Sequence, residues 1–461
     1  MISLSFYGAA GMVTGSKYLL TVNNEQVMID CGMFQGRREI RQLNWKPQPY
    51  KPRSIEAVIL THGHIDHVGF LPRLFHLGFR GRVYASPATV DIAKLSLLDA
   101  AHIQMEDADY RNRKKLTRHK KALPLFDDKD VAKIVPRYSA VEFGDWIKIS
   151  KNISFRFHYA GHILGAASVE VKANDGKIER SILFSGDIGR YGNPLTKVPA
   201  EPPAADYIVC ESTYGGRLHK PADPHQKFIS LINEVYNTGG VLLIPAFAIG
   251  RTQQIVFLID QLISNDLAPE ISIHIDSPMA ISATEIYQKY HDEHIVDTNL
   301  PGEMDIFENP RVHFHRSTEE SKQLNKMKGT RVIISASGMM TAGRILHHMI
   351  VRLPDPKNVL AIVGYQVEGS MGRRLVDGEK LLYIHKQPVE VKARIENFHG
   401  LSGHADYYEI LHWVEKITEN PAKVFITHGE KSQSEEMAKH FKEKRDWDCH
   451  IPHLNETVEL N

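Results

Sequence analysis

At 461 residues the chain is too long for one ordinary hydrophobic core, so two domains are expected. Its formal net charge of +1 at pH 7 excludes a general attraction to polyanions, so any affinity for nucleic acid must come from local patches. The three cysteines, Cys31, Cys210 and Cys449, are too few and too scattered for a disulfide framework or a thiolate zinc site. With no leader-like start and no apolar run of membrane-spanning length, the sequence predicts a soluble, cytoplasmic protein.

The first two predicted strands each run into residues that can bind metal. Residues 27–29 are apolar and end at Asp30, and residues 57–60 are apolar and lead into Thr61-His62-Gly63-His64-Ile65-Asp66-His67. A strand ending at Thr61, followed by a turn at Gly63, would bring His62 and His64 to one ion while Asp66 and His67 reach another. Neutral imidazole and carboxylate ligands favour zinc. The pattern predicts a two-metal site; the alternative is a surface loop that happens to be rich in histidine.

A basic segment follows a helix expected from residue 88 to about residue 110. Its charged residues are Arg111, Arg113, Lys114, Lys115, Arg118, Lys120 and Lys121. Such a cluster could contact the phosphates of a nucleic acid, or it could be a solvated face of a helical hairpin. Both interpretations stay open.

Two later apolar runs also end in candidate ligands. Residues 155–159 precede His162, and residues 181–184 precede Asp187. One heptapeptide cannot complete two coordination shells, so further ligands are expected at the ends of other strands. An aspartate such as Asp187 can bridge two cations roughly 3.5 to 4 Å apart. Taken alone, each of these residues could instead be a capping aspartate or a core histidine.

Helix and strand alternate from about residue 225 to residue 375, which predicts a parallel α/β sheet. Helices are expected at 253–264 and 283–290, and strands at 271–275 and 331–335. Candidate ligands return after residue 400, so this second domain is inserted into the first. The segment 335–339 follows an apolar strand and is expected to open a helix. There Ser335, Ser337 and Gly338 would offer hydroxyl and backbone N–H groups to a phosphate, unless they form only a capped turn.

Asp30, the cluster at residues 62–67, His162 and Asp187 resemble the ordered motifs of the metallo-β-lactamase superfamily. Three later segments resemble the additional motifs of the β-CASP nucleases: Cys210-Glu211-Ser212-Thr213-Tyr214-Gly215, Ser402-Gly403-His404-Ala405-Asp406 and Thr427-His428-Gly429-Glu430. The segments 245–253 and 364–370 are also similar to that group. The match runs nearly end to end and looks most like bacterial and archaeal homologues of the pre-mRNA 3′-end processing endonuclease subunit.

This resemblance implies an α/β fold in which a metallo-β-lactamase αββα sandwich carries an inserted β-CASP α/β domain with a parallel sheet. The expected boundaries are 1–212 for the first part of the metallo-β-lactamase domain, 213–390 for the inserted β-CASP domain and 391–461 for the C-terminal part of the metallo-β-lactamase domain. The implied cofactor is Zn²⁺, with two ions per chain. One ion would be held by His62, His64 and His162, and the other by Asp66, His67 and His428, with Asp187 bridging them.

The expected catalytic residues are Asp66, His404, Glu211 and Asp30. His404 would be the general acid for the leaving 3′ oxygen, Glu211 would hold it, and Asp30 with Thr61 would orient a ligand histidine. The expected substrate contacts are Arg251, Ser335, Ser337 and Gly338.

The expected activity is hydrolysis of single-stranded RNA in RNA processing or decay, endonucleolytic with an added 5′ to 3′ exonuclease action. His428 favours RNA, because β-CASP enzymes acting on RNA resemble one another in having histidine there, while the DNA-repair branch typically has valine. The alternatives are a DNA nuclease, a hydrolase of a small-molecule ester or lactam, and a non-catalytic scaffold, which would have lost ligands. The expected partner is single-stranded RNA; a homodimer is left open and no membrane partner is expected.

Overall fold

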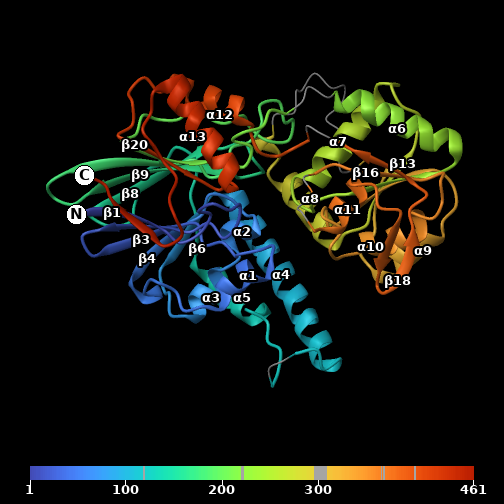
Figure 1. Cartoon of the computed structure of the whole chain (residues 1–461), viewed down its shortest axis with the longest axis horizontal. Coiled ribbons are helices and arrows are strands. Elements are labelled where there is room, and N and C mark those ends of the chain that lie inside the picture. The colour runs from blue at the N-terminus through green and yellow to red at the C-terminus, as the bar shows by residue number, and fades with distance from the viewer. Residues whose placement is uncertain (118–119, 220–222, 295–308, 365, 367–368, 399–400) are drawn as a thin grey trace. The chain divides into compact units, whose positions relative to one another are not determined.

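The computed structural model describes residues 1–117, 120–219, 223–294, 309–364, 366, 369–398 and 401–461 (Figure 1). The chain forms two compact units. Unit 1 comprises residues 1–218 and 404–461, and unit 2 comprises residues 219–403. The second boundary differs from the expected residue 390, because the strand Arg394–Asn397 pairs in parallel with Val359–Ile362 of unit 2. Among the described residues, no helix is both long enough and apolar enough to cross a membrane.

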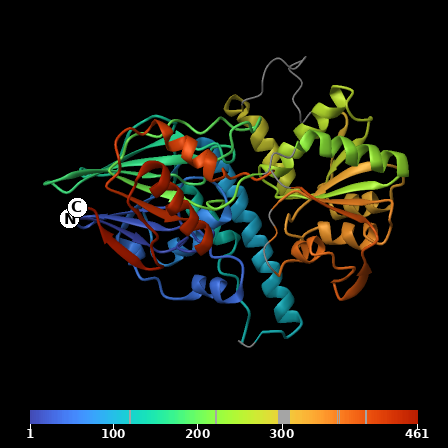
Figure 2. The same ribbon diagram turned by 45° about the horizontal axis from the view of Figure 1, so that its top comes forward.

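Unit 1 is built on two seven-stranded sheets. The first has the order β22-β1-β2-β3-β4-β5-β6, and its strands are β1 Ile2–Phe6, β2 Tyr18–Val22, β3 Glu25–Ile29, β4 Ile55–Ile59, β5 Arg82–Ala85, β6 Tyr138–Ala140 and β22 Glu456–Glu459. The second has the order β21-β20-β11-β10-β9-β8-β7, and its strands are β7 Ile147–Lys148, β8 Ile153–Tyr159, β9 Ala167–Asn174, β10 Glu179–Phe184, β11 Tyr207–Glu211, β20 Lys423–Thr427 and β21 Cys449–His450. Because β1 pairs with β22, both termini lie at the same edge (Figure 2).

The two sheets pack face to face, and helices cover their outer faces. Side chains that alternate along the strands, among them Ile59, Phe157 and Phe425, form the core between the sheets. A second core, which includes Val58 and Leu97, packs the first sheet against its helices. The helices of the unit are α1 Arg38–Arg41, α2 Ile65–Val68, α3 Leu71–His76, α4 Pro87–Arg113, α5 Asp128–Ile134, α12 Tyr407–Trp413 and α13 Lys431–Arg445. This is the expected αββα sandwich.

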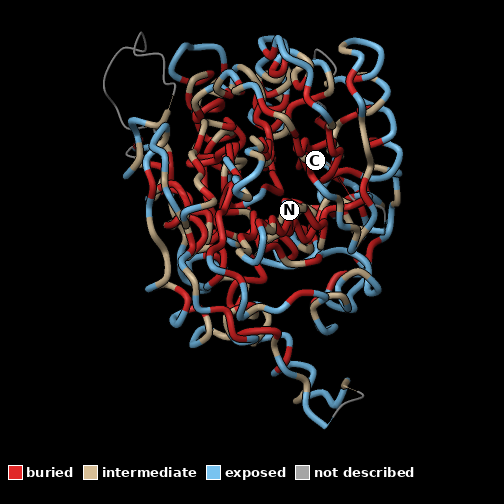
Figure 3. The backbone as a smooth tube through the Cα atoms, turned by 90° about the vertical axis from the view of Figure 1, so that its left-hand side faces the viewer, coloured by how far each residue is buried: buried red, intermediate tan, exposed pale blue. Residues whose placement is uncertain are grey.

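The basic segment lies in unit 1 and begins in the last turn of α4, which contains Arg111 and Arg113. Its described residues, 111, 113–115 and 120–121, are exposed (Figure 3), and Arg111 pairs with Asp107 one turn earlier. Arg118 lies outside the described residues. The exposure suits either interpretation of the segment, so contact with RNA stays a prediction.

Unit 2 has a parallel sheet with helices on both faces, as expected. The strand order is β14-β13-β15-β12-β16-β19, and the strands are β12 Val241–Pro245, β13 Ser272–Ile275, β14 Val312–Phe314, β15 Arg331–Ser335, β16 Val359–Ile362 and β19 Arg394–Asn397. One core joins the sheet to α6 Pro224–Thr238, α7 Arg251–Ser264 and α8 Pro278–Lys289. The other joins it to α9 Thr318–Lys326, α10 Ile345–Arg352, α11 Met371–Val376 and the hairpin of β17 Leu381–Ile384 and β18 Gln387–Glu390.

Two expected helix starts in unit 2 are wrong. The helix expected at 283 begins at Pro278, because the Ser277 side chain accepts a hydrogen bond from the Ala280 N–H and Pro278 suits the first turn. The helix expected to open at Met339 begins only at Ile345. Residues 336–344 form a series of turns instead, in which Ser337 Oγ accepts from the Thr341 N–H at 3.2 Å. Ser337 and Gly338 therefore do not lie at a helix N-terminus, and their contact with a phosphate stays a prediction.

Candidate metal centre

The expected metal ligands all lie in unit 1, at or just beyond the ends of strands. Residues 62–67 follow β4, His162 follows β8, Asp187 follows β10 and His428 follows β20. Two of the residues at these strand ends have left-handed backbones, with φ of 57° at Asp30 and 48° at His428. Such a backbone is unfavourable for a residue other than glycine and is found at functional sites where the surroundings enforce it. Here the enforcing contacts include the His428 N–H, which donates to the Ala9 carbonyl at 2.7 Å.

The first ligand group contains His62, His64, His162 and Asp187, whose ligand atoms lie within 4.8 Å of one another. His64 Nδ1 lies 3.0 Å from His62 Nε2 and 3.2 Å from His162 Nε2. Asp187 Oδ2 lies 3.4 Å from His62 Nε2 and 3.6 Å from His162 Nε2. Four ligands around a tetrahedral zinc, each about 2.0–2.1 Å from the ion, lie about 3.3 Å apart, so this group fits zinc.

The second ligand group contains Asp66, His67 and His428. His428 Nε2 lies 3.2 Å from His67 Nε2 and 3.5 Å from Asp66 Oδ2. The other oxygen of Asp187, Oδ1, faces this group at 3.4 Å from His67 Nε2. It is buried and accepts no hydrogen bond from the residues that the structure describes. A buried carboxylate oxygen without a hydrogen-bond donor is suited to bind a cation held between the two groups.

Burial keeps two of the imidazoles in the form that binds metal. It lowers the pKa of His62 well below the usual value, and the neighbouring His67 lowers it further. Burial also lowers the pKa of His64 to about 4, against the opposing charge of Asp66. Neutral rings at pH 7 have a nitrogen lone pair for a metal ion.

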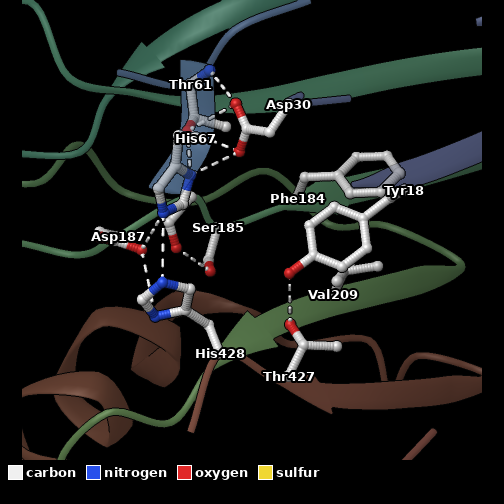
Figure 4. Close-up of a pocket in the computed structure, with 11 residues that line it drawn as sticks. Tyr18, Asp30, Thr61, His67, Phe184, Ser185, Asp187, Val209, Thr427 and His428 are labelled. Atoms are coloured by element: carbon white, nitrogen blue, oxygen red, sulfur yellow. Dashed lines mark hydrogen bonds and ion pairs between the residues drawn. The ribbon is translucent and has the colours of Figure 1, made fainter. Parts of the chain in front are cut away.

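Asp30 lies behind this centre, as expected. Its Oδ2 is 2.7 Å from His67 Nδ1, and its Oδ1 accepts from the Thr61 N–H at 2.8 Å (Figure 4). Because a carboxylate can only accept, the proton of the His67 ring lies on Nδ1. Burial lowers the pKa of His67, but the charges of Asp187 and Asp30 raise that pKa to about 10, so Nε2, which faces His428 and Asp187, would have to lose its proton to bind a metal. This carboxylate–histidine pair is the usual way in which a metal ligand is oriented.

His404 lies at the edge of the centre and belongs to neither ligand group. Its Nδ1 is 3.1 and 3.2 Å from the two carboxylate oxygens of Glu211. Glu211 is buried, and one of its oxygens accepts from the Ile188 N–H at 2.6 Å. Burial lowers the pKa of His404, but the charges of Glu211 and Asp187 outweigh it and raise that pKa to about 9. About 20% of the His404 side chain is exposed, so the ring can meet a substrate.

Three family descriptions match successive parts of the chain. Residues 11–103 match the metallo-beta-lactamase superfamily, residues 252–375 the Beta-Casp domain, and residues 388–452 the Zn-dependent metallo-hydrolase RNA specificity domain. Ribonuclease TTHA0252 of Thermus thermophilus is 35% identical over 93% of this chain and 93% of its own length. The chain belongs to the metallo-β-lactamase/β-CASP ribonuclease family. It is therefore a metal-dependent hydrolase, as the motifs predicted.

Other relatives and one solved structure agree with the family. The RNase J-like protein of Methanocaldococcus jannaschii is 30% identical over 94% of each chain. Transcription termination factor FttA of Methanothermobacter thermautotrophicus is 30% identical over 94% of this chain and 68% of its own. A protein of unknown function from Enterococcus faecalis V583 is similar over 100% of both chains, with a TM-score of 0.58 and 13% identity. That likeness concerns the fold alone.

The structure places one further β-CASP motif residue, Thr213, against the metal centre, which the sequence did not predict. Thr213 Oγ1 lies 3.1 Å from both the Nδ1 and the backbone carbonyl of His428. The carbonyl can only accept, so the single hydroxyl proton points to it and Thr213 accepts from His428 Nδ1–H. The Nε2 lone pair of His428 is then directed at His67 and Asp66. The only sequence signal was the position of Thr213 two residues beyond a strand-terminal Glu211.

Replacing Thr213 with valine is expected to weaken zinc binding about 10- to 100-fold, the usual effect of removing the partner of a ligand histidine. Valine has the same shape but cannot accept the Nδ1 proton. Thr213→Ser, which keeps the hydroxyl, should bind zinc like the wild type. Titration of the apo-protein with zinc against a competing chelator measures the difference, and equal affinities for the valine and serine variants would contradict this role.

The predicted substrate contacts of this β-CASP protein lie in unit 2. Ser335 is the last residue of β15 and is buried, and its hydroxyl donates to the Asp276 carbonyl at 2.8 Å. Arg251 begins α7, and its Nη1 donates to Gln254 at 2.7 Å. Ser337 and Gly338 lie in the turns after β15. The Ser335 hydroxyl therefore links the ends of β15 and β13, and a role for all four residues in binding substrate stays a prediction.

Proposed function

We propose that the chain hydrolyses phosphodiester bonds of single-stranded RNA, acting endonucleolytically with an added 5′ to 3′ exonuclease action. The observation that carries the proposal is the position of the two carboxylate oxygens of Asp187. They face two separate groups of buried ligands, 3.4 Å from His62 on one side and 3.4 Å from His67 on the other. This arrangement suits phosphodiester hydrolysis, because paired cations stabilise both the attacking and the leaving oxygen. The match of residues 388–452 to an RNA specificity domain supports RNA as the polymer.

We infer two zinc ions per chain, one in each ligand group with Asp187 shared between them. Bound zinc supplies a lowered pKa for water and neutralises charge that develops on the phosphate. The protein residues do the rest. Asp30 and Thr213 fix the rings of His67 and His428 through their Nδ1 atoms. Rigid ligands of this kind hold the site in its productive geometry before substrate binds.

His404 is the proposed general acid. Glu211 contacts Nδ1 of its ring, so the proton that is transferred is the one on Nε2. Transfer of that proton to the 3′ oxygen leaves an alcohol and breaks the P–O bond, with water supplying the new P–O bond on the phosphate. Glu211, buried and negatively charged, stabilises the protonated imidazole before the transfer.

Four labelled substrates test the proposal: single-stranded RNA, double-stranded RNA, single-stranded DNA and a chromogenic lactam, each with and without a zinc chelator. We expect cleavage of single-stranded RNA that the chelator abolishes and that added zinc restores. Comparable rates on DNA would favour a DNA nuclease, and hydrolysis of the lactam without RNA cleavage would favour a small-molecule hydrolase. A homodimer stays a prediction that solution mass measurement can check.

A further inference from the structure

Phe247 follows β12 at the carboxyl edge of the unit 2 sheet. β12 pairs in parallel with β15 on one side and β16 on the other. The chain leaves β12 through α7 toward β13, on the β15 side, and leaves β16 toward β19 on the opposite side. The connections after β12 and β16 therefore diverge, which makes this pair a topological switch point. In open parallel sheets, ligands bind outside the carboxyl ends of the strands at such a point.

Among the residues that the structure describes, two glycines, Gly338 and Gly364, lie next to the ring of Phe247. A Cβ added to Gly338, after β15, would lie 3.2 Å from both the ring and the backbone nitrogen of Phe247. A Cβ added to Gly364, after β16, would lie 3.7 Å from the ring. The ring thus packs on bare backbone from the two neighbouring strand ends. A Cβ at position 338 would make a contact with Phe247 that is tighter than usual, so either the ring or the backbone would have to shift slightly.

Gln366 holds these two backbone segments together. Its side-chain amide donates to the Gly338 carbonyl at 3.0 Å and to the Gly364 carbonyl at 3.1 Å, and the residue is buried. The backbone of Phe247 is held too, because Thr252 donates to the Phe247 carbonyl from its hydroxyl at 2.8 Å. The seat of the ring is therefore rigid, and a rigid aromatic loses little conformational entropy on binding.

The ring itself is open to solvent. Phe247 is 43% exposed, whereas its neighbours Ala246, Ala248 and Ile249 are buried. A phenyl ring that is fixed from one side and exposed on the other can stack on a flat partner. Every nucleobase has such a face, and stacking of a base on an aromatic side chain does not depend on the base.

We propose that Phe247 is a stacking platform for one nucleobase of single-stranded RNA. This inference rests on the proposed function and adds a binding residue in unit 2 that the sequence motifs did not assign. The platform takes unpaired strands, because a base within a duplex is stacked on its neighbours and does not present its face. It contributes affinity and register along the strand without selecting a sequence.

The test uses full-length protein with zinc and three substitutions of Phe247. Alanine removes the ring, leucine keeps most of the packing volume without an aromatic face, and tryptophan keeps the face. Because stacking contributes about 1–3 kcal/mol per base, Phe247→Ala and Phe247→Leu should bind single-stranded RNA about 5- to 150-fold more weakly, while Phe247→Trp binds at least as tightly as the wild type. KM should rise and kcat should change little. Tyr236→Ala removes another exposed aromatic of unit 2, 51% exposed on α6, and should leave RNA binding unchanged.

RNA with a single abasic position, moved along the strand, supplies a second readout. At one position the effects of the abasic substitution and of Phe247→Leu on the binding free energy should be non-additive. At the other positions the two effects should add. If the wild type cleaves single-stranded RNA but Phe247→Leu binds it within about twofold of the wild type, the stacking proposal is wrong and the proposed function stands. Non-additivity at no position leads to the same conclusion. If the wild type neither binds nor cleaves RNA, both proposals fail together.

Discussion

Asp187→Ala is expected to release zinc from the site and to lower RNA hydrolysis by a factor on the order of 10⁴ or more. The pKa of water falls from about 15.7 to about 7 only when a metal holds it, so loss of the metal removes most of the catalysis. Asp187 has one oxygen 3.4 Å from His62 Nε2 in the first ligand group and the other 3.4 Å from His67 Nε2 in the second. Its removal therefore affects both ions.

Elemental analysis of the purified variant, alongside rate measurements, checks this result. The wild type should contain about two zinc ions per chain and lose activity with a chelator. Asp145→Ala, which removes an exposed acidic side chain elsewhere in unit 1, serves as the matched control and should keep both metal and activity. Full activity of Asp187→Ala, or of the metal-free wild type, would contradict the proposed two-metal site.

His404→Ala is expected to keep its zinc and to slow RNA cleavage by a factor on the order of 10² to 10⁴, the usual size of a general-acid contribution. Zinc should stay because His404 belongs to neither ligand group. The slow step would then be departure of an unprotonated 3′ oxygen. An RNA with sulfur in place of that bridging oxygen has a better leaving group, so it should be cleaved by the variant at nearly the wild-type rate.

Glu211→Gln provides the matched comparison for His404. Glutamine keeps the size of the side chain but not the charge that faces His404 Nδ1 at 3.1 Å. It should slow cleavage of the normal RNA more than that of the sulfur-containing RNA. Loss of zinc from His404→Ala would instead make His404 a ligand and would reject the assigned role.

Local sequence patterns predicted several elements of this protein and the residues that the structure brings together as candidate ligands. The strand expected at 331–335 is β15, Arg331–Ser335, and the alternation from residue 225 to residue 375 predicted a parallel sheet. Most candidate ligands lie within a few residues of the end of a strand, and the ends of strands within a sandwich converge. The division into two ligand groups was implied by the family resemblance together with residue type and order.

Contacts between distant strands could not be predicted in this way. Thr213 meets His428 because β11 and β20 are parallel neighbours with Glu211 opposite Thr427, and no local pattern reveals that pairing. The assignment of β19 to unit 2 could not be predicted for the same reason, since its pairing with β16 is a long-range contact. The seat of Phe247 also joins three strand ends that lie far apart in the chain.

The left-handed backbone of His428 has a consequence for how this family could diverge. Valine at position 428, which is typical of the DNA-repair branch of β-CASP enzymes, would remove a candidate ligand from the second group. It would also place a β-branched side chain at a φ of 48°, which L-residues with two groups on Cβ rarely adopt. A single substitution would thus disturb the turn after β20 as well as the ligand set.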